Sequence, residues 1–209
     1  MNSNSAGTES SFVGALDAVQ DNNEEAVTDL RELILYACPV GSLVEQLDCF
    51  FQKSLQLCGR NTAHRYMPHC TLTGFFHDEG SSIAAYVKAI DRALSETLAA
   101  ASPEIVVTGM HFEQGFHFLA IASPWLQHLT ATFAQVSQSS TRTDEIRLKT
   151  DLHVSLAYGF APDMEETLRA IAEDLLEGQA ADVGDWELRF YERGGENQWF
   201  LHGSWALDR

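Results

Sequence analysis

The chain has 209 residues, 45% of them hydrophobic, which suits one domain or two small lobes around a shared core. Its 30 acidic and 13 basic residues give a net charge of −17, which argues against a surface that binds duplex nucleic acid. A small anionic ligand is compatible with this charge, because salt screens exposed charges beyond about 8–10 Å.

Residues 1–28 are polar and acidic, which predicts a flexible tail ahead of a single domain over residues 29–209. The N-terminus shows neither the basic nor the apolar region of a signal peptide, and no apolar run is long enough to cross a membrane. We therefore expect a cytoplasmic protein that does not contact a membrane. Four cysteines without metal-site spacing predict reduced thiols in the core: Cys38, Cys49, Cys58 and Cys70.

The first half of the domain alternates strands with helices. An apolar strand over residues 31–40 ends at Pro39 and Gly41, and Ser42 can cap a helix that stops at Gly59. Beyond this helix we predict, in order, a strand over residues 67–76, a helix over 82–100 and a strand over 104–112.

The second half repeats this order. It begins with a strand over residues 116–124, and Ser123 followed by Pro124 predicts the start of the next helix. A polar connection, a strand, a helix and two closing strands follow over residues 141–150, 152–160, 161–178, 186–193 and 198–207. The repetition predicts an α+β fold of two lobes, about 29–112 and 113–209, related by a pseudo-twofold axis.

Two of the predicted strands carry the same polar pattern among apolar residues. Side chains at positions i and i+2 of a strand share a face, so His69 lies beside Thr71, and His153 beside Ser155. The alternate residues should anchor both strands in the core: Cys70, Leu72, Val154 and Leu156. The pseudo-twofold axis would bring both polar pairs into one cleft.

Two imidazoles and two hydroxyls in one cleft suit the hydrolysis of a phosphate ester. A neutral imidazole takes a proton from the attacking water, and an imidazolium protonates the leaving oxygen. The hydroxyls donate to phosphate oxygens, where charge builds in the transition state. We expect no metal or other cofactor, because two histidines with hydroxyls do not form a zinc ligand set. Hydrogen-bonded structural histidines are the alternative, and the pattern leaves open which histidine is the base.

The paired motifs resemble the 2H phosphoesterase superfamily, which is named for two H-x-[ST]-x motifs in a bilobal, LigT-like fold. Residues 37–76 and 152–160 are also similar to the phosphodiesterase domain of the ubiquitin-associated and SH3 domain-containing proteins. The resemblance implies two lobes of antiparallel sheet, flanked by helices around a central cleft. The other modules of those proteins are not expected within 209 residues, so no protein partner is implied.

The resemblance also implies an activity, the hydrolysis of 2′,3′-cyclic phosphates on nucleotides or short oligonucleotides. By position, His69 and His153 would be the catalytic pair, and Thr71 and Ser155 would hold the phosphate of a small anionic nucleotide. Cleavage of a cyclic dinucleotide (cGAMP-like) or of a 2′–5′ oligoadenylate is an alternative within this class. A module that binds cyclic nucleotides or proteins without catalysis is an alternative from another class.

A nucleotide also requires a surface for its base, and aromatic side chains stack on bases. Tyr66 and Tyr158 are the candidates near the motifs. In a regular strand Tyr158 faces away from His153, so it reaches the cleft only if the strand ends or bulges. Four further residues near the motifs could add positive potential, although solvent exposure is the simpler interpretation: His64, Arg65, Arg147 and Lys149.

Overall fold

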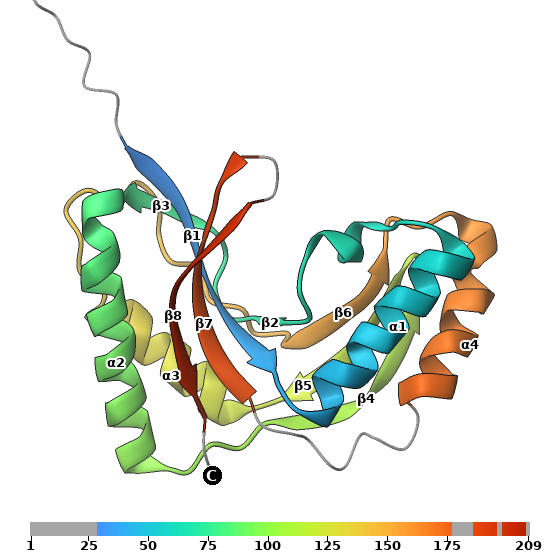
Figure 1. The fold of residues 1–209 in the computed structure, drawn as a ribbon. Coiled ribbons are helices and arrows are strands. Elements are labelled where there is room, and N and C mark those ends of the chain that lie inside the picture. Colours follow the sequence, from blue (N-terminus) through green and yellow to red (C-terminus); the bar gives the residue numbers. More distant parts are fainter. Residues whose placement is uncertain (1–28, 177–185, 196–197, 208–209) are drawn as a thin grey trace, which may run out of the picture.

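The computed structural model describes residues 29–176, 186–195 and 198–207 (Figure 1). The predicted tail over residues 1–28 and the predicted helix end at Gly178 lie outside the described residues. The strands are β1 (Leu30–Pro39), β2 (Cys70–Thr71), β3 (Phe76–Glu79), β4 (Val106–Glu113), β5 (Phe116–Ala122), β6 (His153–Tyr158), β7 (Trp186–Arg193) and β8 (Trp199–Ala206). The α-helices are α1 (Ser42–Cys58), α2 (Ile83–Ala100), α3 (Pro124–Val136) and α4 (Glu165–Leu176).

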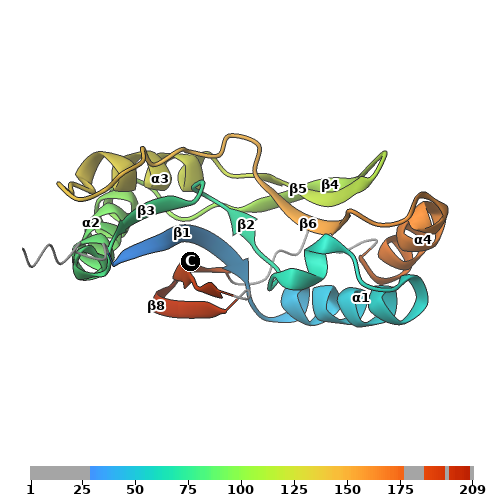
Figure 2. The ribbon, with the colours of Figure 1, turned by 90° about the horizontal axis from the view of Figure 1, so that it is seen from above.

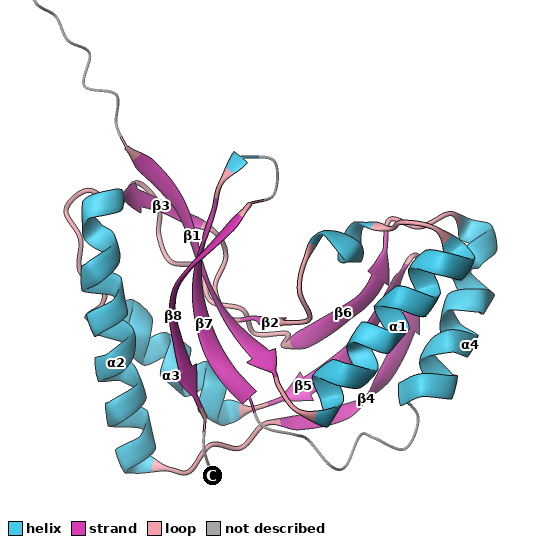
Figure 3. Ribbon diagram, viewed as in Figure 1, coloured by secondary structure: helices cyan, strands magenta, loops and turns pink. Residues whose placement is uncertain are grey.

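The strands form one antiparallel sheet in the order β4-β5-β6-β2-β1-β7-β8, and β3 pairs with β1. Short β2 lies at its centre, where Cys70 pairs with Val154 of β6 and Thr71 pairs with Tyr36 of β1. The two motif strands are therefore direct neighbours. The helices gather at the two ends of the sheet (Figure 3), which confirms the predicted α+β class.

Each end of the sheet draws on both halves of the sequence. β4 of the first half pairs with β5 of the second, and β7 of the second half pairs with β1 of the first. The helices follow the same exchange, since α1 packs on α4 and α2 on α3 (Figures 1 and 2). We predicted lobes over residues 29–112 and 113–209, but that boundary falls inside the tight β4–β5 hairpin, which keeps the two strands together.

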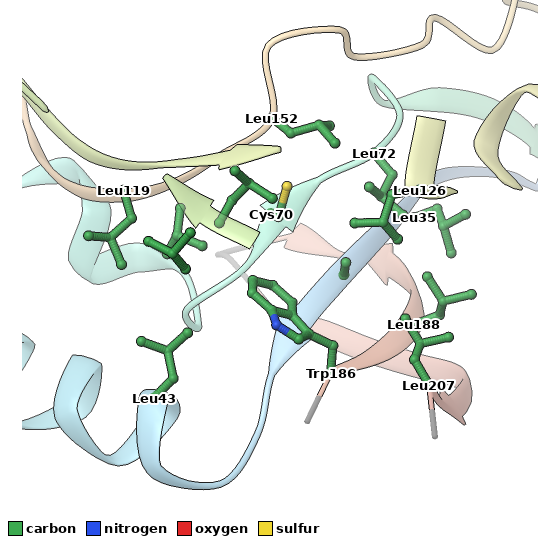
Figure 4. Packing of buried hydrophobic residues seen from close by; sticks show 14 of the residues in the cluster. Leu35, Leu43, Cys70, Leu72, Leu119, Leu126, Leu152, Trp186, Leu188 and Leu207 are labelled. Carbon is green, nitrogen blue, oxygen red and sulfur yellow. The ribbon is translucent and has the colours of Figure 1, made fainter. Parts of the chain in front are cut away.

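The core confirms the predicted alternation in the motif strands. The four anchoring side chains, Cys70, Leu72, Val154 and Leu156, are all fully buried. Figure 4 shows Cys70 and Leu72 in the same packed layer as Leu35 and Leu126. Burial of each leucine side chain stabilises the fold by about 1.5–3 kcal/mol, which fixes the face that each motif strand presents.

All four cysteines are free, but only two of them are in the core as predicted. Cys38 and Cys70 are buried, whereas Cys49 is exposed and Cys58 is partly exposed on α1. The predicted start of α3 is confirmed, because the Ser123 hydroxyl accepts a hydrogen bond from the amide of Leu126 at 3.1 Å. Within the described part of the chain, no helix has the length and apolarity that crossing a membrane requires.

Candidate active site

One cleft of about 270 Å³ collects most of the residues that the sequence suggested for the site, whereas His64 and Arg65 do not line it. Its lining includes both motif pairs and both candidate aromatic residues: His69, Thr71, His153, Ser155, Tyr66 and Tyr158. The described residues contain no group of three or more side chains able to hold a metal ion.

The pairing of β2 with β6 places the two motifs diagonally across the cleft. Because Cys70 lies opposite Val154 in an antiparallel pair, His69 lies opposite Ser155 and Thr71 lies opposite His153. Directly opposed side chains are about 4.5–5.5 Å apart at Cβ, and diagonal neighbours about 7–8 Å apart. Each imidazole therefore faces the hydroxyl of the other motif, and the two imidazoles lie at opposite corners.

Both imidazoles are held by the same backbone contact. Nδ1 of His69 lies 2.7 Å from the carbonyl oxygen of Met67, and Nδ1 of His153 lies 2.9 Å from that of Asp151. A carbonyl oxygen only accepts hydrogen bonds, so Nδ1 of each ring carries the proton. Each Nε2 is then left as the atom that accepts or donates a proton in the cleft.

The surroundings of His69 distinguish it from its counterpart. The buried ring of Tyr36 lies 4.0 Å from the His69 ring between centroids, and Tyr66 lies 5.7 Å away. Burial, opposed by the hydrogen bond to Met67 and aided by the nearby charge of His153, lowers the pKa of His69 to about 4. The His69 imidazole is therefore neutral at pH 7.

Phenylalanine rings pack against His153 instead of tyrosine rings. The rings of Phe116 and Phe118 each lie 5.4 Å from its imidazole, in edge-to-face contact. Both phenylalanines come from β5, the strand that corresponds to β1 in the repeated order. The two motifs are alike in sequence and in backbone contacts, but the aromatic residues of the flanking strands β1 and β5 give the two histidines different surroundings.

A bulge brings Tyr158 into the cleft. Ser155 pairs with Phe118 and Ala157 pairs with His117, so Leu156 is an extra residue in β6. Leu156 and Ala157 are consequently both buried, and Tyr158 returns to the face of Ser155. Tyr158 thus lines the cleft because β6 bulges, as the sequence pattern required.

Tyr66 reaches the cleft from a short 3₁₀ helix over Thr62–Arg65. The Asn61 side chain caps this helix by accepting a hydrogen bond from the Ala63 amide at 2.9 Å. His64 completes the cap, since its Nδ1 accepts from the Asn61 amide at 3.2 Å. His64 thus holds the segment that carries Tyr66, which corrects our interpretation of it as a solvent-exposed loop residue.

Arg147 and Lys149 also line the cleft, although the sequence favoured simple solvent exposure for both. Their segment was predicted as a polar connection, but it runs beside the end of the first motif strand. The Gly74 amide donates to the Arg147 carbonyl at 2.7 Å, and the Lys149 amide donates to the Leu72 carbonyl at 3.0 Å. The signal in the sequence is the i, i+2 spacing, which puts both cations on one face of an extended segment.

Comparison with known proteins agrees with the geometry. The model of the 2′-5′ RNA ligase superfamily matches residues 42–195. Ecdysteroid-phosphate phosphatase of Bombyx mori is 32% identical over 85% of this chain and 27% of its own length. Human ubiquitin-associated and SH3 domain-containing protein B is 34% identical over 69% of this chain and 23% of its own length. The chain thus spans about a quarter of the length of these curated relatives.

Among solved structures, E. coli LigT complexed with ATP has a TM-score of 0.42 at 13% identity, over 86% of this chain and 99% of LigT. This likeness is too weak to support conclusions about the site. The family match is sufficient by itself, because it covers both motif strands and the helices between them. The chain therefore belongs to the 2′-5′ RNA ligase superfamily of 2H phosphoesterases.

Proposed function

We propose that this protein is a phosphodiesterase that opens 2′,3′-cyclic phosphates on nucleotides or short oligonucleotides without a metal ion. The observation that carries the proposal is the matched pair of histidines. Each has Nδ1 fixed by the carbonyl two residues before it, and each leaves Nε2 to the same cleft. A structural histidine would have no need of a second, identically oriented ring on the neighbouring strand.

The lowered pKa of His69 favours it as the general base. Its neutral Nε2 accepts a proton from water as the water oxygen bonds to phosphorus. The bond from phosphorus to the 2′ or 3′ oxygen breaks, and protonated His153 donates its Nε2 proton to that oxygen. Thr71 and Ser155 donate hydrogen bonds to the non-bridging oxygens. The diagonal placement of the imidazoles supports this division, because attack and departure occur on opposite sides of phosphorus.

The size of the cleft favours one nucleotide over a whole cyclic dinucleotide. A cavity of about 270 Å³ lies just below the range for small-molecule sites, about 300–1,000 Å³. Tyr66 and Tyr158 supply aromatic faces for the base, and stacking contributes about 1–3 kcal/mol per base.

In EDTA, the purified protein should hydrolyse 2′,3′-cyclic mononucleotides to a single 2′- or 3′-phosphate isomer, identified by chromatography. Cyclic dinucleotides and 2′–5′ oligoadenylates tested in parallel should react more slowly, because the cleft accommodates one nucleotide. Binding without turnover of any substrate would instead identify a sensor. A requirement for added Zn²⁺ or Mn²⁺ would contradict the two-histidine mechanism.

The acid limb of kcat/KM should lie near pH 4 rather than near 6.5, the ordinary value for histidine. His69 acts as base in its neutral form, so activity is lost only when falling pH protonates it at its lowered pKa. The mechanism requires a protonated acid as well as a neutral base, which gives a bell-shaped profile. Tyr36→Ala, which exposes the His69 ring, should move the acid limb to higher pH.

Circular dichroism at each pH separates this loss of activity from unfolding. An acid limb near 6.5 in the unmodified protein, or one that Tyr36→Ala leaves in place, would show that His69 is not the base. A flat profile from pH 5 to 9 would argue against paired histidines as acid and base.

A further inference from the structure

Two cations on one wall of the cleft have no role in the mechanism above. Arg147 and Lys149 are exposed, line the cleft, and form no ion pair among the described residues. Several other basic side chains are neutralised by ion pairs, among them Arg31, Arg92 and Arg193. Arg147 and Lys149 are thus available to an anionic ligand.

The charge of the cleft is opposite in sign to that of the protein. Apart from the histidines and three tyrosines, its ionisable lining residues are Arg147, Lys149 and Asp151, so two cations face one carboxylate there. The whole chain has a net charge of −17. Because distant exposed charges are screened within about 8–10 Å, these local cations dominate the field that a bound anion experiences.

The two cations lie along the segment that follows Thr71, and Arg147 is the farther of the two from the proposed reaction centre. The pairing of Thr73 with Leu148 sets Lys149 opposite Leu72 and Arg147 opposite Gly74. Gly74 is three residues beyond Thr71, so their Cα atoms are at most about 10 Å apart. The Arg147 guanidinium lies against Gly74, where even a Cβ atom would approach it to 3.1 Å. The Arg147 guanidinium therefore lies beyond the phosphate that Thr71 would hold.

We propose that Arg147 and Lys149 form a second phosphate site, so that the preferred substrate carries another phosphate in addition to the one that reacts. This inference rests on the proposed function, because it takes the position of the reacting phosphate from it. A guanidinium and an ammonium are the side chains that bind phosphate oxygens through charge-assisted hydrogen bonds. The second phosphate is either a 5′-phosphate on the same nucleotide or the diester that joins it to the preceding nucleotide.

Kinetics with three substrates test the site and distinguish its two sources. They are adenosine 2′,3′-cyclic phosphate, its 5′-phosphorylated form, and the dinucleotide ApA that ends in a 2′,3′-cyclic phosphate. One or both of the substrates with a second phosphate should have at least about tenfold higher kcat/KM than the first. Arg147→Gln and Lys149→Gln should each remove most of that advantage and change kcat/KM for the simple substrate by less than about threefold.

Lys88→Gln is the matched control, since Lys88 is an exposed cation on α2, outside the cleft, and its loss should leave all three values unchanged. Equal losses on all three substrates in the Arg147 and Lys149 variants, or no advantage of a second phosphate in the unmodified protein, would overturn the inference.

Calorimetric binding of adenosine 3′-monophosphate and 3′,5′-bisphosphate, with ApAp as the third probe, separates this inference from the proposed function. Tighter binding of a two-phosphate probe, lost in Arg147→Gln, together with no turnover of any substrate would leave the second phosphate site standing and reject the hydrolase. Turnover without any such preference, in kinetics or in binding, would reject the site and leave the hydrolase standing.

Discussion

Replacing His69 or His153 with alanine should lower kcat/KM for a 2′,3′-cyclic nucleotide by about 10²–10⁴-fold, the usual contribution of one acid–base group. Each variant removes an Nε2 that faces the cleft while leaving the backbone pairing of β2 with β6 in place. Initial rates over a range of substrate concentrations measure the effect. Thermal unfolding of each variant confirms that the fold is retained.

His128→Ala is the control, because His128 is an exposed histidine on α3 that does not line the cleft. Its activity should equal that of the unmodified protein. The double variant of His69 and His153 should be less impaired than the product of the two single effects, since residues that act together in one step are not additive. Near-normal activity in either single variant would exclude the paired mechanism.

A substrate with a better leaving group should separate the base from the acid. A p-nitrophenyl phosphodiester releases a stable phenolate, which needs no proton from the enzyme. His153→Ala should therefore be much less harmful with this substrate than with a cyclic nucleotide, whereas His69→Ala should be about equally harmful with both. The reverse result would exchange the two roles, and equal effects would show that neither histidine protonates the leaving oxygen.

The repeated motif made the centre of the site predictable. In both strands the residue at i+2 from the histidine is a hydroxyl, so the shared face is polar. His117 differs from the motif histidines because its i+2 residue is Leu119. The side chains of His117 and Leu119 are both buried on the core face of β5. His117 therefore faces the core, whereas the two motif histidines face the cleft.

Other features depend on contacts between distant parts of the chain. The burial of His69 comes from Tyr36 on β1, which no local pattern connects to the motif. The place of Arg147 depends on a pairing with Gly74, 73 residues earlier. Tyr158 enters the cleft through a bulge, and bulges leave no reliable mark in a single sequence. The exchange of β4 and β7 between the halves is likewise a property of the assembled sheet.

Removing the two hydroxyls should lower kcat, by about 10²–10³-fold for each hydroxyl if it stabilises the transition-state charge as an oxyanion donor does. Thr71→Val keeps the size and branching of the side chain, and Ser155→Ala removes one oxygen atom. Both residues are only partly buried, so unfolding free energies should change by less than about 1 kcal/mol. Steady-state kinetics should show the loss in kcat, with KM changed much less.

The diagonal geometry makes the hydroxyl prediction specific. Ser155 lies opposite His69 and Thr71 opposite His153, so in the proposed mechanism the two hydroxyls would approach the phosphate from opposite strands and contact different oxygens. Losses from the two single variants should then combine nearly multiplicatively in the double variant, unlike those of the histidines. Ser95→Ala, which removes an exposed hydroxyl from α2, controls for the loss of a hydroxyl as such. If Thr71→Val and Ser155→Ala are both within about threefold of normal, the hydroxyls do not stabilise developing charge, and the catalytic site reduces to its imidazoles.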